Sequence, residues 1–233
     1  MKDSKEYARK VRKLYRALKT SQPKVEKVVY DEPEEAIVHG ILSENMSEAK
    51  VKSALKRFDQ YFIDYNDLRV SRSEEIIEVL GGDNAVTREV AHSITAALMA
   101  GFQKYNVVSL SALKKIGKRQ ARKILEKMNG VSGFVVDYCM LTALNAHAIP
   151  LSAGMIEYLK DNQLVHPDAD EQQIEGFLAR QISIKNAYEF YVLLRRKSES
   201  GRRTKKKKAV KKTTKVKKKV KTKVKKKTTK KKK

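Results

Sequence analysis

The chain has 233 residues, of which 52 are Lys or Arg and 27 are Asp or Glu, so its formal net charge is +25 at pH 7. Its single cysteine, Cys139, excludes an internal disulfide, a cysteine-rich zinc site and a four-cysteine iron–sulfur cluster, and we therefore expect no metal and no cofactor. Because no apolar run approaches the roughly 20 residues of a membrane span and the N-terminus lacks a signal-peptide core, we expect an intracellular protein without a membrane partner, in the cytoplasm or nucleoid (the nucleus in a eukaryote).

Residues 1–29 predict a basic helix followed by a linker. Tyr7, Val11, Tyr15 and Leu18 recur at helical spacing and form one apolar stripe. We expect this stripe to pack on the core of the following domain.

Residues 30–198 predict one all-α domain. Apolar residues recur there at helical spacing, and no stretch alternates with a period of two. The apolar stripes begin at Ala36, Val51, Ile76, Val86, Leu110, Ala121 and Val135, and further helices begin near Ser152, Asp168 and Ser183. Asp168 and Glu171 have the spacing of a capping box. The count is about nine or ten helices with short connections.

A short glycine-containing turn separates two of these helices, within residues 118–146. Such a hairpin turns backbone N–H groups outward at the electropositive start of the next helix, which suits a phosphate. The predicted contacts are Asn129, Gly130, Val131, Ser132 and Gly133 in the turn, with Lys118, Arg119 and Arg122 just upstream. The alternative is an ordinary helix corner with a solvated basic face.

Residues 199–233 form a lysine-rich segment, here called the basic tail. From Gly201 onward it holds 19 Lys, 2 Arg and no acidic residue, which leaves 31 basic and 27 acidic residues in the rest of the chain. Like charges at this density predict disorder and strong, salt-dependent binding to a polyanion. Lysine does not form the bidentate contact that reads guanine, so we expect largely sequence-independent binding to double-stranded DNA, while RNA stays open as a partner. The representative contacts are Lys205, Lys206, Lys207 and Lys208.

Three blocks in order, Asp31–Phe58, Ala121–Leu144 and Ala148–Val165, resemble the helix-hairpin-helix DNA glycosylases of the endonuclease III type. The first carries Leu42-Ser43-Glu44-Asn45-Met46-Ser47-Glu48 where the family has Leu-Ser-x-Gln-x-Thr-Asp. The second resembles the family's hairpin and central helix, and the third resembles its Val-Pro-Val-Asp-Thr-His-Val stretch. The resemblance covers about 165 residues and implies the glycosylase fold. The composition of the basic tail resembles the tails of linker histones.

The chain departs from this family at the positions that carry its chemistry. Phe134 stands where bifunctional members have the lysine that attacks the sugar, and Ser152 stands where members have an aspartate. Neither side chain supplies a nucleophilic amine or a negative charge. Asn45 matches the glutamine that wedges into DNA in the family. Asp137 lies off the family positions and is expected at the surface, whereas Glu44, beside the wedge position, is an alternative carboxylate.

These observations favour a monomeric DNA-binding protein of the glycosylase fold that has lost catalysis. One alternative is an active base-excision repair glycosylase or lyase with a rearranged site. Another is a nucleoid or chromatin scaffold that bridges DNA and an unidentified protein partner. Because both family positions are replaced, the chain is expected not to be an enzyme, and if it is one, the resemblance implies a DNA N-glycosylase.

Overall fold

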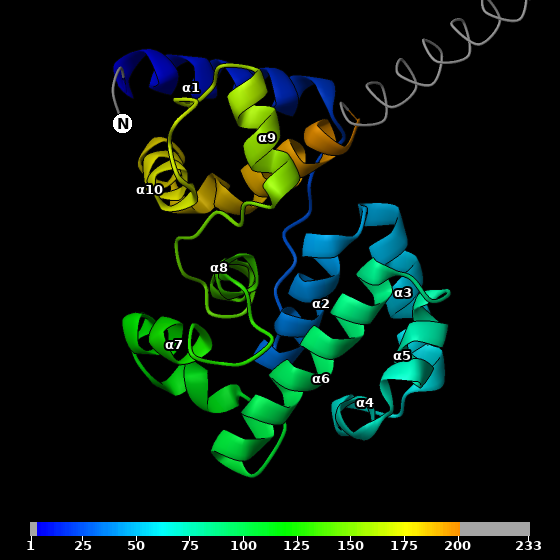
Figure 1. Cartoon of the computed structure of the whole chain (residues 1–233). Coiled ribbons are helices and arrows are strands. Elements are labelled where there is room, and N and C mark those ends of the chain that lie inside the picture. Colours follow the sequence, from blue (N-terminus) through cyan, green and yellow to red (C-terminus); the bar gives the residue numbers. More distant parts are fainter. Residues whose placement is uncertain (1–3, 201–233) are drawn as a thin grey trace, which may run out of the picture.

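The computed structural model describes residues 4–200. The regular secondary structure of these residues is entirely helical, without a strand (Figure 1). The helices with defined bounds are α1 (Ser4–Ser21), α2 (Pro33–Asn45), α3 (Glu48–Tyr61), α4 (Tyr65–Val70), α5 (Ser73–Leu80), α6 (Ala85–Tyr105), the 3-10 helix η1 (Ser111–Lys115), α7 (Lys118–Leu125), α8 (Gly133–Thr142), α9 (Ala153–Asp161) and α10 (Glu171–Gln181). Residues 184–200 form a further helix. The all-α prediction is confirmed for this range, while the prediction for residues 201–233, Lys205–Lys208 included, lies outside the described residues.

Helix α8 lies at the centre of the fold, between a group formed by α1, α9 and α10 and a group formed by α2 to α7 (Figure 1). Every side chain from Phe134 to Thr142 is buried, because this stretch is apolar on nearly all sides and can pack against both groups. Ser132 caps the start of α8, and its hydroxyl oxygen accepts a hydrogen bond from the Val135 amide at 3.2 Å.

The long helix α6 supports the second group. Asn84 caps it by accepting hydrogen bonds from the Val86 and Thr87 amides, at 3.0 and 3.2 Å. Its far end stops at Asn106, which is in the left-handed conformation with φ of 57°. Helices α2, α4 and α5 pack along α6 (Figure 1), and this gives the hairpin before α8 a rigid surface to rest on.

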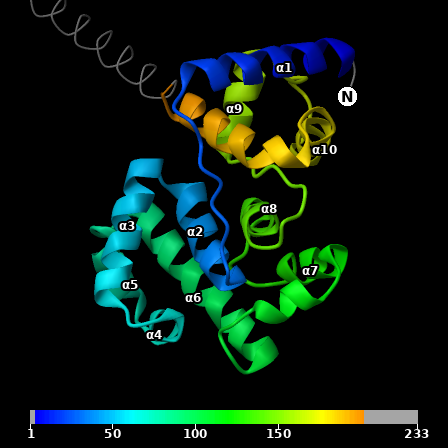
Figure 2. The same cartoon turned by 180° about the vertical axis from the view of Figure 1, so that it is seen from behind.

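Helix α1 packs against the C-terminal part of the described chain. Ala8, Val11 and Leu18 are buried. Lys19 binds Glu189 at 3.0 Å, and the Gln22 side chain donates to the Leu193 carbonyl at 3.2 Å. The extended residues between α1 and α2 cross from one group of helices to the other (Figure 2).

The structure corrects two predicted helix starts and adds one helix that was not predicted. Helix α10 is capped by Asp170, whose carboxylate accepts from the Gln173 amide at 2.8 Å, so the capping box at Asp168 and Glu171 was wrong by two residues. Helix α8 begins at Gly133, before the apolar run at Val135, because its cap and first residue are polar or small. Helix α4 was missed, since six residues are too few to display a periodic stripe.

Candidate nucleic-acid interface

The hairpin between α7 and α8 rests directly on α6. Gly130 has φ of 78°, in the left-handed region that favours glycine. A Cβ atom at this position would lie 2.4 Å from the Ser93 carbonyl oxygen and 2.9 Å from the Ala97 nitrogen, both in the backbone of α6. Gly130 therefore holds the hairpin against its support, which is a packing role that the sequence pattern did not distinguish from phosphate contact.

Gly133 is the hairpin glycine that faces open space. It is exposed, and a Cβ atom there would meet no heavy atom within 4 Å. As the first residue of α8 it has an amide without a helical acceptor, and the neighbouring amide of Phe134 lacks one as well. The space beside this helix start, where a side chain at position 133 would stand, is therefore free of other protein atoms among the described residues. Asn129 is also exposed, whereas Val131 is half-buried against the core.

The basic side chains around the hairpin fall into two sets. Among residues 4–200, Arg119 makes no hydrogen bond or ion pair, and it is exposed, as are three further cations at intervals of four residues, Lys115, Lys123 and Lys127. The other predicted contacts are partly engaged. Lys118 donates to the Asn145 carbonyl, and Arg122 binds Asp137 and lies 3.5 Å from Glu126. We call Lys115, Arg119, Lys123 and Lys127 the exposed row. The sequence analysis predicted Arg119 as a contact but did not predict Lys127.

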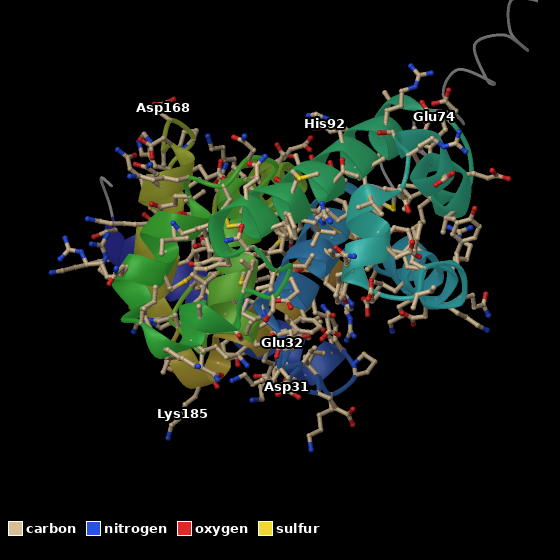
Figure 3. All side chains as sticks on the ribbon, turned by 90° about the horizontal axis from the view of Figure 1, so that it is seen from below. Asp31, Glu32, Glu74, His92, Asp168 and Lys185 are labelled. Atoms are coloured by element: carbon tan, nitrogen blue, oxygen red, sulfur yellow. The ribbon has the colours of Figure 1, made fainter. Side chains whose placement is uncertain are left out.

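The 3-10 helix before the hairpin is tied to the start of α2. Lys114 donates to the carbonyl of Asp31, and the Ser109 hydroxyl donates to the Glu32 carboxylate at 3.2 Å. Asp31 and Glu32 lie close to each other in Figure 3. These contacts reduce the freedom of the segment that leads into α7, so the exposed row keeps its position relative to the fold.

Asp137 is buried, contrary to the prediction of a surface charge. Its side chain is 2% exposed and is paired with Arg122, because α8 is enclosed on this side by α7 and α10. Burial raises its pKa even though Arg122 opposes the effect. On α10, Glu175 faces Asp137, and burial together with this neighbouring carboxylate raises the pKa of Glu175 to about 7.

Phe134, which the sequence analysis predicts at the position of the family lysine, is part of an aromatic cluster. Its ring is 2% exposed and lies 6.2 Å from the rings of both Tyr138 and Tyr191. Tyr138 in turn contacts Tyr30, with 3.0 Å between the hydroxyl oxygens. These rings occupy the interior at the start of α8, so a long amine at position 134 would have to displace them.

Ser152 and Asn45 line one small cavity. The cavity has a volume of about 250 Å³, and its remaining walls are Ser43, Glu44, Met46, Ser47, Gly154, Arg195, Ser198 and Glu199. Ser152 stands at the cap position of α9, but its side chain makes no capping hydrogen bond. Asn45 donates to the Ile41 carbonyl at 3.0 Å. The structure thus brings together the two residues that were predicted to match the family's aspartate and wedge.

Glu44 connects this cavity to the hairpin. The Ser132 hydroxyl donates to its carboxylate at 2.7 Å, and burial raises the pKa of Glu44. Glu44 also lines a neighbouring hollow of about 500 Å³ beside α9. In the sequence, only the proximity of Glu44 to Asn45 indicated that Glu44 belongs to the site. Its contact with Ser132 spans 88 residues, so no local pattern contains it.

Two further reactive side chains, Cys139 and His39, have pKa values shifted by burial. Cys139 is buried, and its pKa is raised to about 12 by burial. His39 contacts the Tyr30 hydroxyl at 2.6 Å, and burial lowers its pKa to about 4. The described residues contain no group of three or more His, Cys, Asp or Glu side chains that could hold a metal ion. In the same range no helix is both long and apolar enough to cross a membrane.

A glycine-containing hairpin that leads into a buried central helix, with helices grouped on both sides of it, defines the helix-hairpin-helix DNA glycosylase fold, and residues 4–200 have this fold. No family model matches the sequence, and no curated protein sequence matches it significantly.

Three solved structures illustrate the likeness. A trapped covalent complex of endonuclease III with DNA superimposes with a TM-score of 0.63 at 18% identity, over 80% of this chain and 84% of that one. A thermostable thymine-DNA glycosylase gives a TM-score of 0.61 at 13% identity, over 84% and 88% of the two chains. The Clostridium acetobutylicum 8-oxoguanine glycosylase/lyase, bound to double-stranded DNA, gives 0.62 at 15% identity, over 86% and 71%. At these identities the likeness concerns the fold.

Proposed function

We propose that this protein binds double-stranded DNA through the hairpin and the basic tail and does not excise bases. The observation that carries the proposal is the contrast at the start of α8. Gly133 leaves an open helix terminus in the hairpin that follows the exposed cations of α7. The next residue, Phe134, is buried and packs in the aromatic cluster. The first feature suits a phosphate, and the second leaves no amine to attack a sugar. The DNA-bound endonuclease III and 8-oxoguanine glycosylase/lyase structures support a DNA partner for the same fold.

The test measures binding and chemistry on the same duplexes. A panel of duplexes that carry single lesions or abasic sites is incubated with the full chain, and base release, strand scission and borohydride-trapped imine are recorded. We expect tight binding without base release. A second protein ending at Ser200 controls for slow attack on abasic sites by lysines of the basic tail. A trapped complex from this shorter protein would contradict the proposal.

A second candidate function rests on Glu44. A half-buried carboxyl group with a raised pKa, beside a cavity that Ser152 also lines, is the kind of group that can transfer a proton to a flipped base. In this reading the chain is a glycosylase with a rearranged site. Base release that disappears in Glu44→Gln, while DNA affinity is retained, would establish it over the binding function.

A further inference from the structure

We propose that the solvent-facing side of α1 is a second phosphate-backbone site, which binds another segment of double-stranded DNA while the hairpin holds the first. This inference rests on the proposed DNA-binding function and extends it from holding one duplex to bridging two. The site is an open groove of about 710 Å³ along α1 and the end of α10. Its walls are Ser4, Lys5, Ala8, Arg9, Arg12, Lys13, Arg16 and Gln181.

Five cations line this groove without an acidic residue among its walls. All five are exposed. The Arg12 side chain is held in place by the Gln181 side-chain oxygen at 2.9 Å. The acid within α1, Glu6, pairs with Lys10 at 2.7 Å, and Glu189, which contacts α1, pairs with Lys19 at 3.0 Å.

The spacing of these cations fits a nucleic-acid backbone. Residues 5, 9, 12 and 16 follow one another at intervals of three or four, so their side chains project from one face of α1. At a rise of about 1.5 Å per residue this row covers about 16 Å. One strand of duplex DNA carries a phosphate about every 3.4 Å along its axis, so the row matches about five phosphates.

The composition of the groove favours a duplex over a membrane surface. Ala8 is the only apolar residue in its walls, and it is buried. A helix that inserts into a lipid surface needs large apolar side chains beside its basic face, and α1 turns its larger ones, Val11 and Leu18, into the core.

The groove on α1 lies away from the hairpin, so a duplex bound there is a different duplex from the one on the hairpin. Helix α1 crosses one end of the molecule, and α7 with its hairpin lies at the other end, in both opposite views (Figures 1 and 2). The body of the fold lies between the two surfaces. A straight duplex seated on the hairpin therefore leaves the groove on α1 open to another duplex.

The test uses the full chain and measures the capture of a second duplex. Beads that carry one duplex are loaded with protein, and the retention of a fluorescent duplex of different sequence is recorded. The variant replaces Lys5, Arg9, Lys13 and Arg16 by Gln, which keeps helix propensity similar. The matched control replaces four exposed lysines outside the groove, the hairpin and the basic tail, Lys24, Lys50, Lys56 and Lys104, by Gln and so removes the same charge.

We expect the α1 variant to lower capture by about tenfold or more while its affinity for a single duplex, measured by anisotropy, changes by less than about threefold. The control is expected to keep capture within about twofold of the unmodified chain. Equal losses in both variants would mean that capture follows total charge, and the inference would be overturned. Absence of single-duplex binding would instead contradict the proposed function itself.

A crosslinking measurement locates the second duplex. Because Cys139 is fully buried, a cysteine introduced by Ser4→Cys is the accessible thiol of the described chain and can carry a benzophenone. Crosslinks from this position to the second duplex are expected, and the same label at Ser53→Cys, exposed on α3, is the control. Equal crosslinking from both positions would overturn the inference. So would loss of binding to phosphatidylserine vesicles in the α1 variant with unchanged duplex capture.

Discussion

Gly130 and Gly133 are three residues apart in one turn and have different physical reasons to be glycine. At Gly130 the backbone of α6 is so close that no side chain fits, and the conformation is left-handed. At Gly133 there is room for any side chain, so what a substitution changes there is the surface that a ligand meets. Only Gly133 is therefore an informative position for testing DNA contact without disturbing the fold.

We predict that Gly133→Glu, in the protein ending at Ser200, weakens duplex binding by about tenfold or more, because a carboxylate then faces the phosphates at the start of α8. The fold should be retained, since an acidic residue in the first turn of a helix is favourable. Anisotropy measures the affinity, and circular dichroism measures the helical content. Gly176→Glu on α10, also in open space, is the matched control. If both variants bind as the unmodified protein does, the hairpin is a structural corner only.

We predict that Phe134→Lys lowers the free energy of unfolding by about 3 to 5 kcal/mol, because the substitution removes aromatic packing and buries an amine between Tyr138 and Tyr191. Denaturant unfolding followed by circular dichroism measures this loss. Phe134→Met, of similar volume, should cost less than about 1.5 kcal/mol. A fully stable Phe134→Lys variant would show that the start of α8 still has room for the family's lysine.

At the scale of elements, the contact between α8 and α10 depends on shared protons. Asp137 and Glu175 are two carboxyl groups in one enclosed contact, and Arg122 supplies a single positive charge. One cation does not neutralise two carboxylates, so Glu175 keeps its proton to higher pH than it would in the unfolded chain. The contact between α8 and α10 therefore stabilises the fold most when Glu175 is protonated.

We predict that this contact stabilises the fold at low pH and that its contribution is lost as the pH rises through about 7, the raised pKa of Glu175 in the folded chain. Glu175→Gln mimics the protonated form, so it should flatten this dependence and raise the free energy of unfolding at pH 8. The gain is on the order of 1 kcal/mol once solvent screening is discounted. Unfolding in denaturant between pH 5 and pH 8 measures it. Glu78→Gln, exposed on α5, should leave the pH dependence unchanged, and an identical slope for both variants would contradict the prediction.

Local patterns predicted the helices longer than α4, with errors at the starts of α8 and α10, and were insufficient for the contacts between helices. The spacing of Val86, Val90 and Ile94 predicts α6, and Gly81 marks the end of α5 with φ of 102°. The burial of Asp137 depends on which helix covers it, and that information is absent from its own neighbours in the sequence. The contact of Glu44 with Ser132 joins residues 88 apart, so no motif contains it.

At the scale of the whole molecule, charge is divided unevenly between the fold and the basic tail. Gly201–Lys233 carry 21 positive groups, and the first 200 residues carry 31 basic against 27 acidic groups. The tail therefore has the larger capacity to release counterions from DNA, whereas the few exposed cations of the hairpin define where the fold sits.

We predict that deletion of Gly201–Lys233 flattens the salt dependence of duplex binding severalfold. Each phosphate that is neutralised contributes about −0.9 to the slope of log K against log salt concentration, and up to 21 charges are removed. Affinity measured at several salt concentrations gives the slope, and circular dichroism checks the helical content of the shorter protein. An unchanged slope would mean that the fold alone carries the non-specific affinity.

The pairing of α1 with the last described helix also bears on the order in which the protein matures during synthesis. Tyr15 donates to Glu189, 174 residues away, and Gln22 reaches Leu193 across 171 residues. At about 5 to 20 residues per second, α1 leaves the ribosome roughly 10 to 35 s before these partners exist. During this interval its apolar stripe has nothing to pack on, while its dense positive charge keeps nascent chains apart. The group of helices around α1 is thus assembled last, after the hairpin and its support on α6 are already in place.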